Sequence, residues 1–404
     1  MSTAAPQRPS WLLKLVIILS ASTQTLAFTV PMPLLSRMAA DLARGPADAY
    51  MVKMVMGVIG PAIVAGAALG GLLVDKGPRR ATMVGAGILF ALAGAAPFIL
   101  RNLPAILATR FLLGMAATAV ATVGTALVGD CFDETRRPAW TGALGAAALA
   151  AGVLSLPAAG VIGEIGWRYA YLLYLLGLPI AALALVGMRT APRGGAAPTA
   201  AASDAASAGA PRAISARNYP FEIFAMAFLN GALFTLPTVY LSFYVKKFGV
   251  DDPTLVSGLL TTSSLVAAVF AVLYGRVRKR LSSTALFGIA FALGGASLAM
   301  LALAPSVLVA EAAMVVLGVA SGWFTPNLFA AILDTVDEHH RGRASGITYA
   351  SAAIGPAVGI TALEPLVARI GVDGVFLLLA GLCIVTAAGA VIGRVGRPRL
   401  APAS

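Results

Sequence analysis

Residues 54–74 read MVMGVIGPAIVAGAALGGLLV, a run of 21 residues without a charged side chain. Lys53 precedes this run and Asp75 follows it. An α-helix rises about 1.5 Å per residue, so about 20 apolar residues cross the hydrocarbon core of a bilayer. The stretch therefore predicts one transmembrane helix, and windows of this kind decide the fold class.

Eleven further windows share these properties. Each window is 19 to 30 residues long and lacks the sustained alternation of apolar and polar residues that a β-barrel requires. Hydrophobic residues make up 59% of the 404 residues and charged residues 11%, whereas soluble domains are about 25% charged. We therefore expect an all-α integral membrane protein with twelve transmembrane helices. The other windows are Leu15–Ser36, Ala81–Leu100, Phe111–Gly129, Pro138–Gly163, Tyr169–Met188, Ile223–Val245, Pro253–Gly275, Leu281–Ala310, Ala312–Leu333, Ala344–Leu363 and Gly374–Gly393.

The basic residues predict the orientation of these helices. If the N-terminus is cytoplasmic, 20 of the 29 Lys and Arg residues fall in cytoplasmic segments and 8 in outer segments, with Arg110 inside a window. The positive-inside rule selects this orientation, and an even number of helices then places both termini in the cytoplasm. The net charge of +12 is thus explained by orientation and by contact with anionic lipid headgroups, and no nucleic-acid partner is expected.

The longest polar stretch divides the windows six and six. Residues 189–217 are rich in Ala, Pro, Gly and Ser, which predicts a flexible cytoplasmic linker between six-helix bundles at 1–188 and 218–404. Three short patterns recur in the same order in both bundles, at offsets of 206, 204 and 199 residues. Such repeats predict two pseudo-symmetric halves, as in many transporters. The matched pairs are 24–31 with 230–237, 133–137 with 337–341, and 157–160 with 356–359.

The loop between the second and third windows carries the most specific motif. Residues 71–80 read GLLVDKGPRR and resemble the G-x-L-x-D-R-x-G-R-R motif of the major facilitator superfamily, a resemblance that extends over essentially the whole chain. Pro78 replaces the second glycine, and the equivalent loop at 275–280 has no acidic residue. The resemblance implies a latch of charged residues that holds the cytoplasmic ends of the two halves together in the outward-open state. A role in topology alone is the alternative. The predicted latch residues are Asp75, Arg79, Arg80 and Asp130.

Two further motifs are similar to those of the drug or small-molecule–proton antiporters of this superfamily. Arg110 begins an R-x-x-x-G pattern that ends at Gly114, which implies a role in proton coupling. The alternative for Arg110 is a snorkelling anchor near the headgroups. The antiporter pattern of the fifth helix is half present, because Pro157 and Gly160 match it and two other glycines are replaced.

The resemblance also implies that the first, fourth, seventh and tenth helices line a central cavity. At 100° per residue, Gln24 and Phe28 share one stripe of a helix, as do Asn230 and Phe234. An amide beside an aromatic ring in each half suits an amphipathic ligand near the midplane. Interhelical hydrogen bonding is the alternative for the two amides. The predicted substrate contacts are Gln24, Phe28, Thr29, Asn230, Phe234, Thr235, Tyr240, Trp323 and Asn327.

One acidic residue is the best sequence candidate for proton coupling. Glu311 lies just inside the predicted tenth helix, and a carboxylic acid within the membrane is by default a functional candidate. A hydrogen-bonded structural glutamate and a position at the lipid interface are the alternatives for Glu311. Glu222 and Glu364 lie at the ends of their windows, where we expect interfacial positions.

Together these features predict a secondary transporter that exports a small amphipathic organic molecule or drug by alternating access, in exchange for protons. The sequence has no nucleotide-binding loop and no metal-ligand spacing, so we expect no enzyme activity, no cofactor and no metal site. We expect a monomer in a bacterial inner membrane. A uniporter or proton symporter that imports a sugar, amino acid or organic acid is the alternative. A membrane sensor or polytopic membrane enzyme is the alternative from a different class.

Overall fold

The computed structural model describes residues 10–76, 78–133, 135–188, 220–336, 338–393 and 395, and this part of the chain is helical without strands. The predicted linker at 189–217 lies outside the described residues, so the domain boundaries stay a prediction. The first half contains α1 (Trp11–Ser20), α2 (Ser22–Thr29), η1 (Met32–Leu34), α3 (Leu35–Leu42), α4 (Pro46–Gly57), α5 (Ile59–Lys76), α6 (Arg79–Ala95), η2 (Ala96–Phe98), α7 (Leu103–Cys131), α8 (Arg137–Ile165), α9 (Trp167–Ala170), η3 (Tyr171–Leu176) and α10 (Gly177–Gly187). The second half contains α12 (Phe221–Tyr244), η4 (Val245–Phe248), α13 (Pro253–Arg278), α14 (Ser283–Leu303), α15 (Val307–Thr335) and α16 (Glu338–Ile392).

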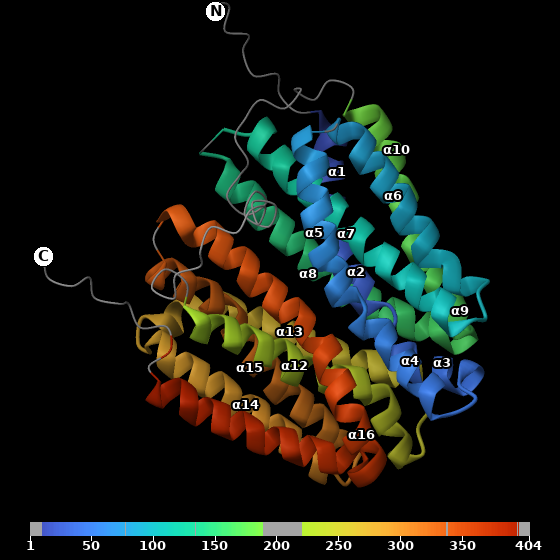
Figure 1. Ribbon diagram of the computed structural model, residues 1–404, viewed down its shortest axis with the longest axis vertical. Helices are drawn as coiled ribbons and strands as arrows, with labels where there is room; N and C mark the ends of the chain where they lie inside the picture. Colours follow the sequence, from blue (N-terminus) through green and yellow to red (C-terminus); the bar gives the residue numbers. More distant parts are fainter. Residues whose placement is uncertain are drawn as a thin grey trace, which may run out of the picture.

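The last helix accounts for two of the expected spans. Within the described ranges, eleven helices are long and apolar enough to cross a membrane, and the last of these, Arg343–Ile392, contains 50 residues. A straight helix of that length would measure about 75 Å, more than twice the roughly 30 Å of a hydrocarbon core. Instead, α16 bends at Gly371, whose φ of 73° glycine adopts at little cost (Figure 1). The expected all-α fold with twelve spans is confirmed.

The internal repeat is visible in atomic detail at the ends of α7 and α15. Arg137 donates from Nε to the carbonyl of Phe132 at 3.0 Å and from Nη2 to the carbonyl of Gly129 at 2.8 Å. Arg341, 204 positions later, makes the equivalent bonds to the last carbonyls of α15 at 3.1 and 3.0 Å. Carbonyls at a helix C-terminus lack partners within the helix, and a cation there also favours the helix dipole. The C-termini of α7 and α15, which correspond in the two halves, are thus capped by an arginine in the same way.

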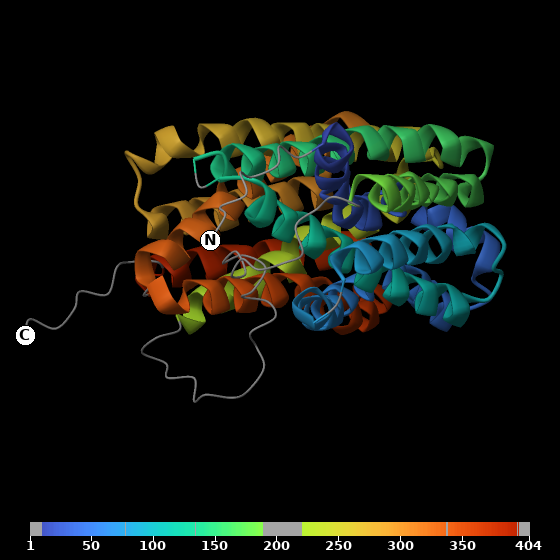
Figure 2. The same cartoon turned by 90° about the horizontal axis from the view of Figure 1, so that it is seen from above.

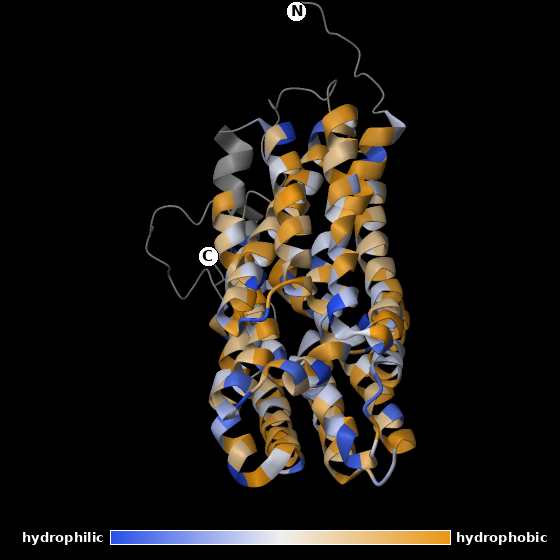
Figure 3. Ribbon diagram, turned by 90° about the vertical axis from the view of Figure 1, so that its right-hand side faces the viewer, coloured by the Kyte–Doolittle hydropathy of each residue, from blue (hydrophilic) through white to orange (hydrophobic). Residues whose placement is uncertain are grey.

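The helices of both halves run side by side along a common direction (Figure 2). We call the side on which the described chain begins and ends the terminal side. The distal side is the opposite one, with the bend at Gly371 and the loops that precede α4, α7 and α13. The halves meet on the distal side, and α5 and α16 separate toward the terminal side (Figure 1). Hydrophobic residues cover the flanks of the helices, and hydrophilic residues gather at the distal loops (Figure 3).

Aromatic side chains fill the interior of the second half. Phe324 of α15 contacts Phe234 of α12 and both Phe287 and Phe291 of α14, with ring centroids 5.5 to 6.1 Å apart. Tilted and edge-to-face pairs of this kind add stabilisation beyond the area that they bury. The second half is therefore closely packed, which favours its movement as one body.

Candidate functional site

Two main helix contacts join the halves, and both lie on the distal side. In the first contact, α4 and α5 lie against α16. The hydroxyls of Tyr50 and Thr361 form a hydrogen bond of 2.9 Å across the halves. A Cβ atom added at Gly60 would overlap the backbone oxygen of Ala353. Only a glycine allows α5 and α16 to approach this closely.

The second contact is between α8 and α13. A Cβ atom added at Gly160 of α8 would overlap the side chain of Ser257 of α13. Arg37 of α3 joins the two helices at their distal ends, because its guanidinium donates to the carbonyl of Gly163 at 2.9 Å and to that of Asp251 at 3.0 Å. The described conformation is thus closed on the distal side.

An ion pair between the halves completes the distal contact. Lys53 Nζ of α4 lies 2.6 and 2.7 Å from the two carboxylate oxygens of Glu364 of α16. Tyr240 of α12 donates a hydrogen bond to the same carboxylate at 2.8 Å, and Lys53 Nζ lies 4.8 Å from its ring centroid. Sequence reasoning missed this pair and expected Glu364 to be interfacial. The signal available was a lysine and a glutamate at the same predicted depth, but a chain of twelve helices offers many such combinations.

A second polar group lies nearer the middle of the molecule. Gln24 of α2 donates to Thr118 of α7 at 3.4 Å and accepts a hydrogen bond from Tyr349 of α16 at 3.2 Å. Tyr349, which sequence reasoning did not select, is 42% exposed and links the second half to the first. Phe28, Asn230 and Thr235, all predicted substrate contacts, are half-buried. The side chain of Asn230 makes no hydrogen bond within the described part of the chain.

Five other predicted substrate contacts have partners other than Gln24 in the structure. Thr29 bonds Ser155 of α8 at 2.6 Å within the first half. Phe234 belongs to the aromatic interior of the second half, and Trp323 lies edge-on against Phe270 of α13. Asn327 is fully buried, where its amide accepts from Tyr274 and Ser283 at 3.2 and 3.0 Å. Tyr240, described above, lies at the distal ion pair. For these five residues, contact with substrate stays a prediction.

Arg110 lies inside the first half and is fully buried. Its Nη2 donates to the carbonyls of Ala93 and Gly94, each at 2.7 Å, at the end of α6. The guanidinium lies 5.0 Å from the ring centroids of both Tyr171 and Tyr174 of η3. Arg110 therefore reaches no headgroup in this conformation and instead ties α7 to α6 and η3.

Glu311 occupies the second turn of α15, near the distal side, and is half-buried. Its carboxylate makes no hydrogen bond or ion pair with the described residues. The structure thus leaves this group accessible and does not select between a proton carrier and a position at the lipid interface.

The predicted latch lies on the terminal side. Arg79, at the start of α6, forms an ion pair with Asp130 near the end of α7, and Arg80 donates to the carbonyl of Leu185 at 2.6 Å. Both interactions stay within the first half. Asp75 lies in the last turn of α5, and its side chain lies outside the described residues. The role of these residues as a latch between the halves therefore stays a prediction.

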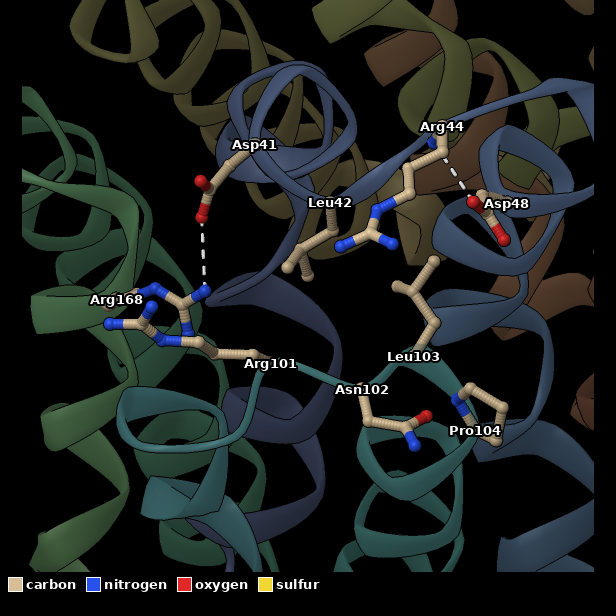
Figure 4. Close-up of a pocket in the computed structure, with 9 residues that line it drawn as sticks. All are labelled: Asp41, Leu42, Arg44, Asp48, Arg101, Asn102, Leu103, Pro104 and Arg168. Carbon is tan, nitrogen blue, oxygen red and sulfur yellow. Dashed lines mark hydrogen bonds and ion pairs between the residues drawn. The ribbon is translucent and has the colours of Figure 1, made fainter.

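A surface cavity of about 590 Å³ opens among the distal loops of the first half. Figure 4 shows Arg44, Arg101 and Arg168 around it, and Asp41 paired with Arg168 at 3.0 Å. Arg168 also donates to two carbonyls at the end of η2, at 3.0 and 2.6 Å. None of the predicted substrate contacts lines this cavity, and Arg168 with Asp41 ties the loops together.

These features define a polytopic helical membrane protein of two repeated halves that meet on one side. The chain matches the Major Facilitator Superfamily over residues 17–260 and 251–403, and it belongs to that superfamily. A search of curated proteins finds no match.

Solved structures of transporters share the fold. The nucleoside transporter NupG is 16% identical, with a TM-score of 0.72, and the match covers 94% of this chain and 99% of that one. A POT family transporter in complex with a thioalcohol-conjugated peptide is 14% identical, with a TM-score of 0.75 and coverage of 95% and 96%. A D-xylose–proton symporter is 16% identical, with a TM-score of 0.73 and coverage of 94% and 95%. These identities show the fold and not the substrate, and together with membership of the superfamily they indicate a membrane transporter.

Proposed function

We propose that the protein is a secondary active transporter that exports a small amphipathic organic molecule or drug by alternating access, in exchange for protons. The observation that carries this proposal is the confinement of the two interhelical contacts and the Lys53–Glu364 pair to the distal side. Contacts on one side only are what a transporter needs if its halves separate there while closing on the other side.

The character of the substrate is inferred from the residues around Gln24. Gln24, Thr118 and Tyr349 offer neutral donors and acceptors that connect the two halves, and Phe28 lies one helical turn from Gln24 on the same helix. Lys53 and Glu364 pair with each other, and the guanidinium of Arg110 is fully buried inside the first half, so none of the three offers an accessible counter-charge to a substrate with a localised charge. This lining supports an aromatic molecule of low polarity, including one whose charge is delocalised over its rings, such as ethidium.

Proton exchange is proposed from the resemblance to drug–proton antiporters together with the accessible carboxylate of Glu311. We place the terminal side in the cytoplasm of a bacterium, on the positive-inside argument, so that the described conformation faces inward. The working unit is proposed to be a monomer surrounded by lipid. Import of a sugar, amino acid or organic acid by uniport or proton symport is the second candidate, which the fold shared with a D-xylose–proton symporter favours.

Transport into proteoliposomes separates these candidates. The purified full chain is reconstituted with an acidic or an alkaline interior, with the membrane potential clamped, and ethidium, uridine, xylose and a dipeptide serve as probes. We expect ethidium to accumulate only when the interior is acidic, because outward proton flow then drives uptake. Accumulation of a probe in an alkaline interior would instead establish symport, and equilibration without accumulation would establish uniport.

Two matched variants connect transport with the central group. Gln24→Ala removes the amide that contacts both halves, and we expect it to reduce ethidium uptake at least tenfold. Ser22→Ala is the control, because the Ser22 hydroxyl bonds the carbonyl of Leu19 in the preceding turn. Equal uptake by the two variants would contradict the placement of the substrate at Gln24.

A further inference from the structure

Lys53 and Glu364 form a buried ion pair that connects the two halves. Their side chains are 9% and 22% exposed, so the carboxylate retains a narrow path to water while the ammonium is covered. By contrast, the pair of Lys247 and Asp373 lies within the second half and is 29% and 51% exposed. Exposed pairs contribute little to stability, whereas a buried pair depends strongly on the presence of both charges. Loss of the charge on Glu364 must therefore weaken the contact between the halves.

The elements around Glu364 bring few other charges to it. The segment 283–303 of α14, which packs against α16, has no charged or titratable residue. Asp48, at the start of α4, accepts from the backbone of Arg44 at 2.9 Å. The other titratable and charged groups on this end of α16 and on the elements packed against it are Lys53 and Tyr50 of α4, Tyr240 and Tyr244 of α12, Glu311 of α15, and Arg369 and Asp373 of α16 itself, the last paired with Lys247.

We propose that Glu364 is a proton-binding site that couples proton uptake to opening of the distal side. When the halves separate there, Lys53 moves away with the first half, and Glu364 stays beside Tyr240 in the second half. A proton from water on the distal side then binds one carboxylate oxygen of Glu364 and neutralises the charge that Lys53 had balanced. No other bond forms or breaks. The inference rests on the alternating movement of the halves proposed above.

Linkage gives the direction of the pH effect. An adjacent cation favours the charged form of a carboxylate, and Lys53 lies beside Glu364 only while the distal side is closed. Because the coupling between two equilibria is reciprocal, a fall in pH favours the open distal side and a rise in pH favours the closed one. Uptake of one proton per opening changes the ratio of open to closed molecules by at most about tenfold per pH unit.

Distances between spin labels test this coupling. Ala47 and Ala368 are exposed residues on the distal side of the first and second halves, and labels there report the separation of the halves. The reconstituted full chain, with Cys131→Ser and Cys383→Ala to remove the native thiols, is measured between about pH 8 and pH 5.5. We expect longer distances at low pH, with the ratio of open to closed molecules rising by about tenfold or more.

Three variants assign the effect. Glu364→Gln should favour the open distal side already at pH 8 and lose the pH response. Lys53→Gln removes the cation, so low pH should no longer favour opening in that variant, which provides a second test if Glu364→Gln fails to fold. Asp373→Asn removes a carboxylate from a pair within one half and should respond to pH as the unmodified chain does.

The outcomes distinguish this inference from the proposed function. A pH response that persists undiminished in Glu364→Gln would overturn the role of Glu364, because the response would then come from another group such as Glu311. Distances that change on addition of ethidium but never with pH would also overturn it, while alternating access would stand. Distances that stay fixed on both sides of the molecule under every condition would contradict the proposed function itself.

Discussion

The substitution Gly60→Ala should selectively destabilise the conformation described here. The three atoms nearest to a Cβ at this position are the backbone oxygen and carbon of Ala353 and the backbone nitrogen of Ile354, all in the second half. Backbone atoms cannot rotate away as a side chain can. The added methyl group therefore forces α5 and α16 apart wherever the distal side is closed.

The size of the effect follows from the location of the overlap. Overpacking of a well-packed contact costs about 1–3 kcal/mol, and this cost applies only while the halves are in contact. In an exposed helix, alanine is favoured over glycine by about 1 kcal/mol, so folding of the first half is not impaired. The closed-to-open ratio on the distal side should fall by roughly 5- to 150-fold.

Spin labels at Ala47 and Ala368 measure this ratio, and Gly85→Ala is the matched control. A Cβ atom at Gly85 of α6 has no neighbour within 4 Å, so that variant changes helix propensity without touching the second half. We expect longer distal distances in Gly60→Ala and unchanged distances in Gly85→Ala. Identical distance distributions in both variants would refute the reasoning, because the overlap at Gly60 would then have been relieved within the closed state.

Three further predictions concern the other candidate residues. Glu311→Gln should abolish uphill uptake of ethidium while sparing exchange at equal concentrations; unchanged accumulation would exclude Glu311 as the carrier. Arg110→Lys keeps the charge but loses the planar guanidinium and its contacts with the rings of Tyr171 and Tyr174, so the free energy of unfolding should fall by about 1–3 kcal/mol. The thermal midpoint measures this loss, and Arg101→Lys on the surface is the control. Asp75→Asn should weaken the predicted latch and lower the population of molecules with a closed terminal side by about fivefold, equivalent to about 1 kcal/mol. Spin labels at Thr135 and Lys279 report that population. An unchanged population would contradict the latch.

The sequence predicts the fold of this chain well because a segment that crosses the membrane must be both apolar and hydrogen-bonded within itself. Uncharged windows of sufficient length must become helices, and all twelve appear in the structure. The bend of α16 at Gly371 falls between the windows Ala344–Leu363 and Gly374–Gly393, as expected for two separate spans. The recurrence of Arg137 as Arg341 likewise extends from the sequence to the hydrogen bonds at the helix ends.

The candidate site is harder to predict, because a helical stripe does not reveal what it faces. Phe234 shares a stripe with Asn230, and Asn327 is another predicted substrate contact, yet Phe234 and Asn327 are both buried against neighbouring helices of the second half. Lys53 and Glu364 are 311 positions apart, and only the packing of α4 against α16 brings them together. Tyr349 has no motif around it, and its contact with Gln24 depends on how closely the two halves meet.

The central claim is that the two halves close alternately on the distal and terminal sides. The most direct measurement is the pair of distance distributions from labels at Ala47 and Ala368 and from labels at Thr135 and Lys279, recorded on the same reconstituted protein across the same pH range. The account predicts that the distal distance lengthens as the terminal distance shortens, with the same midpoint. A terminal distance that stays constant or lengthens while the distal side opens would contradict it.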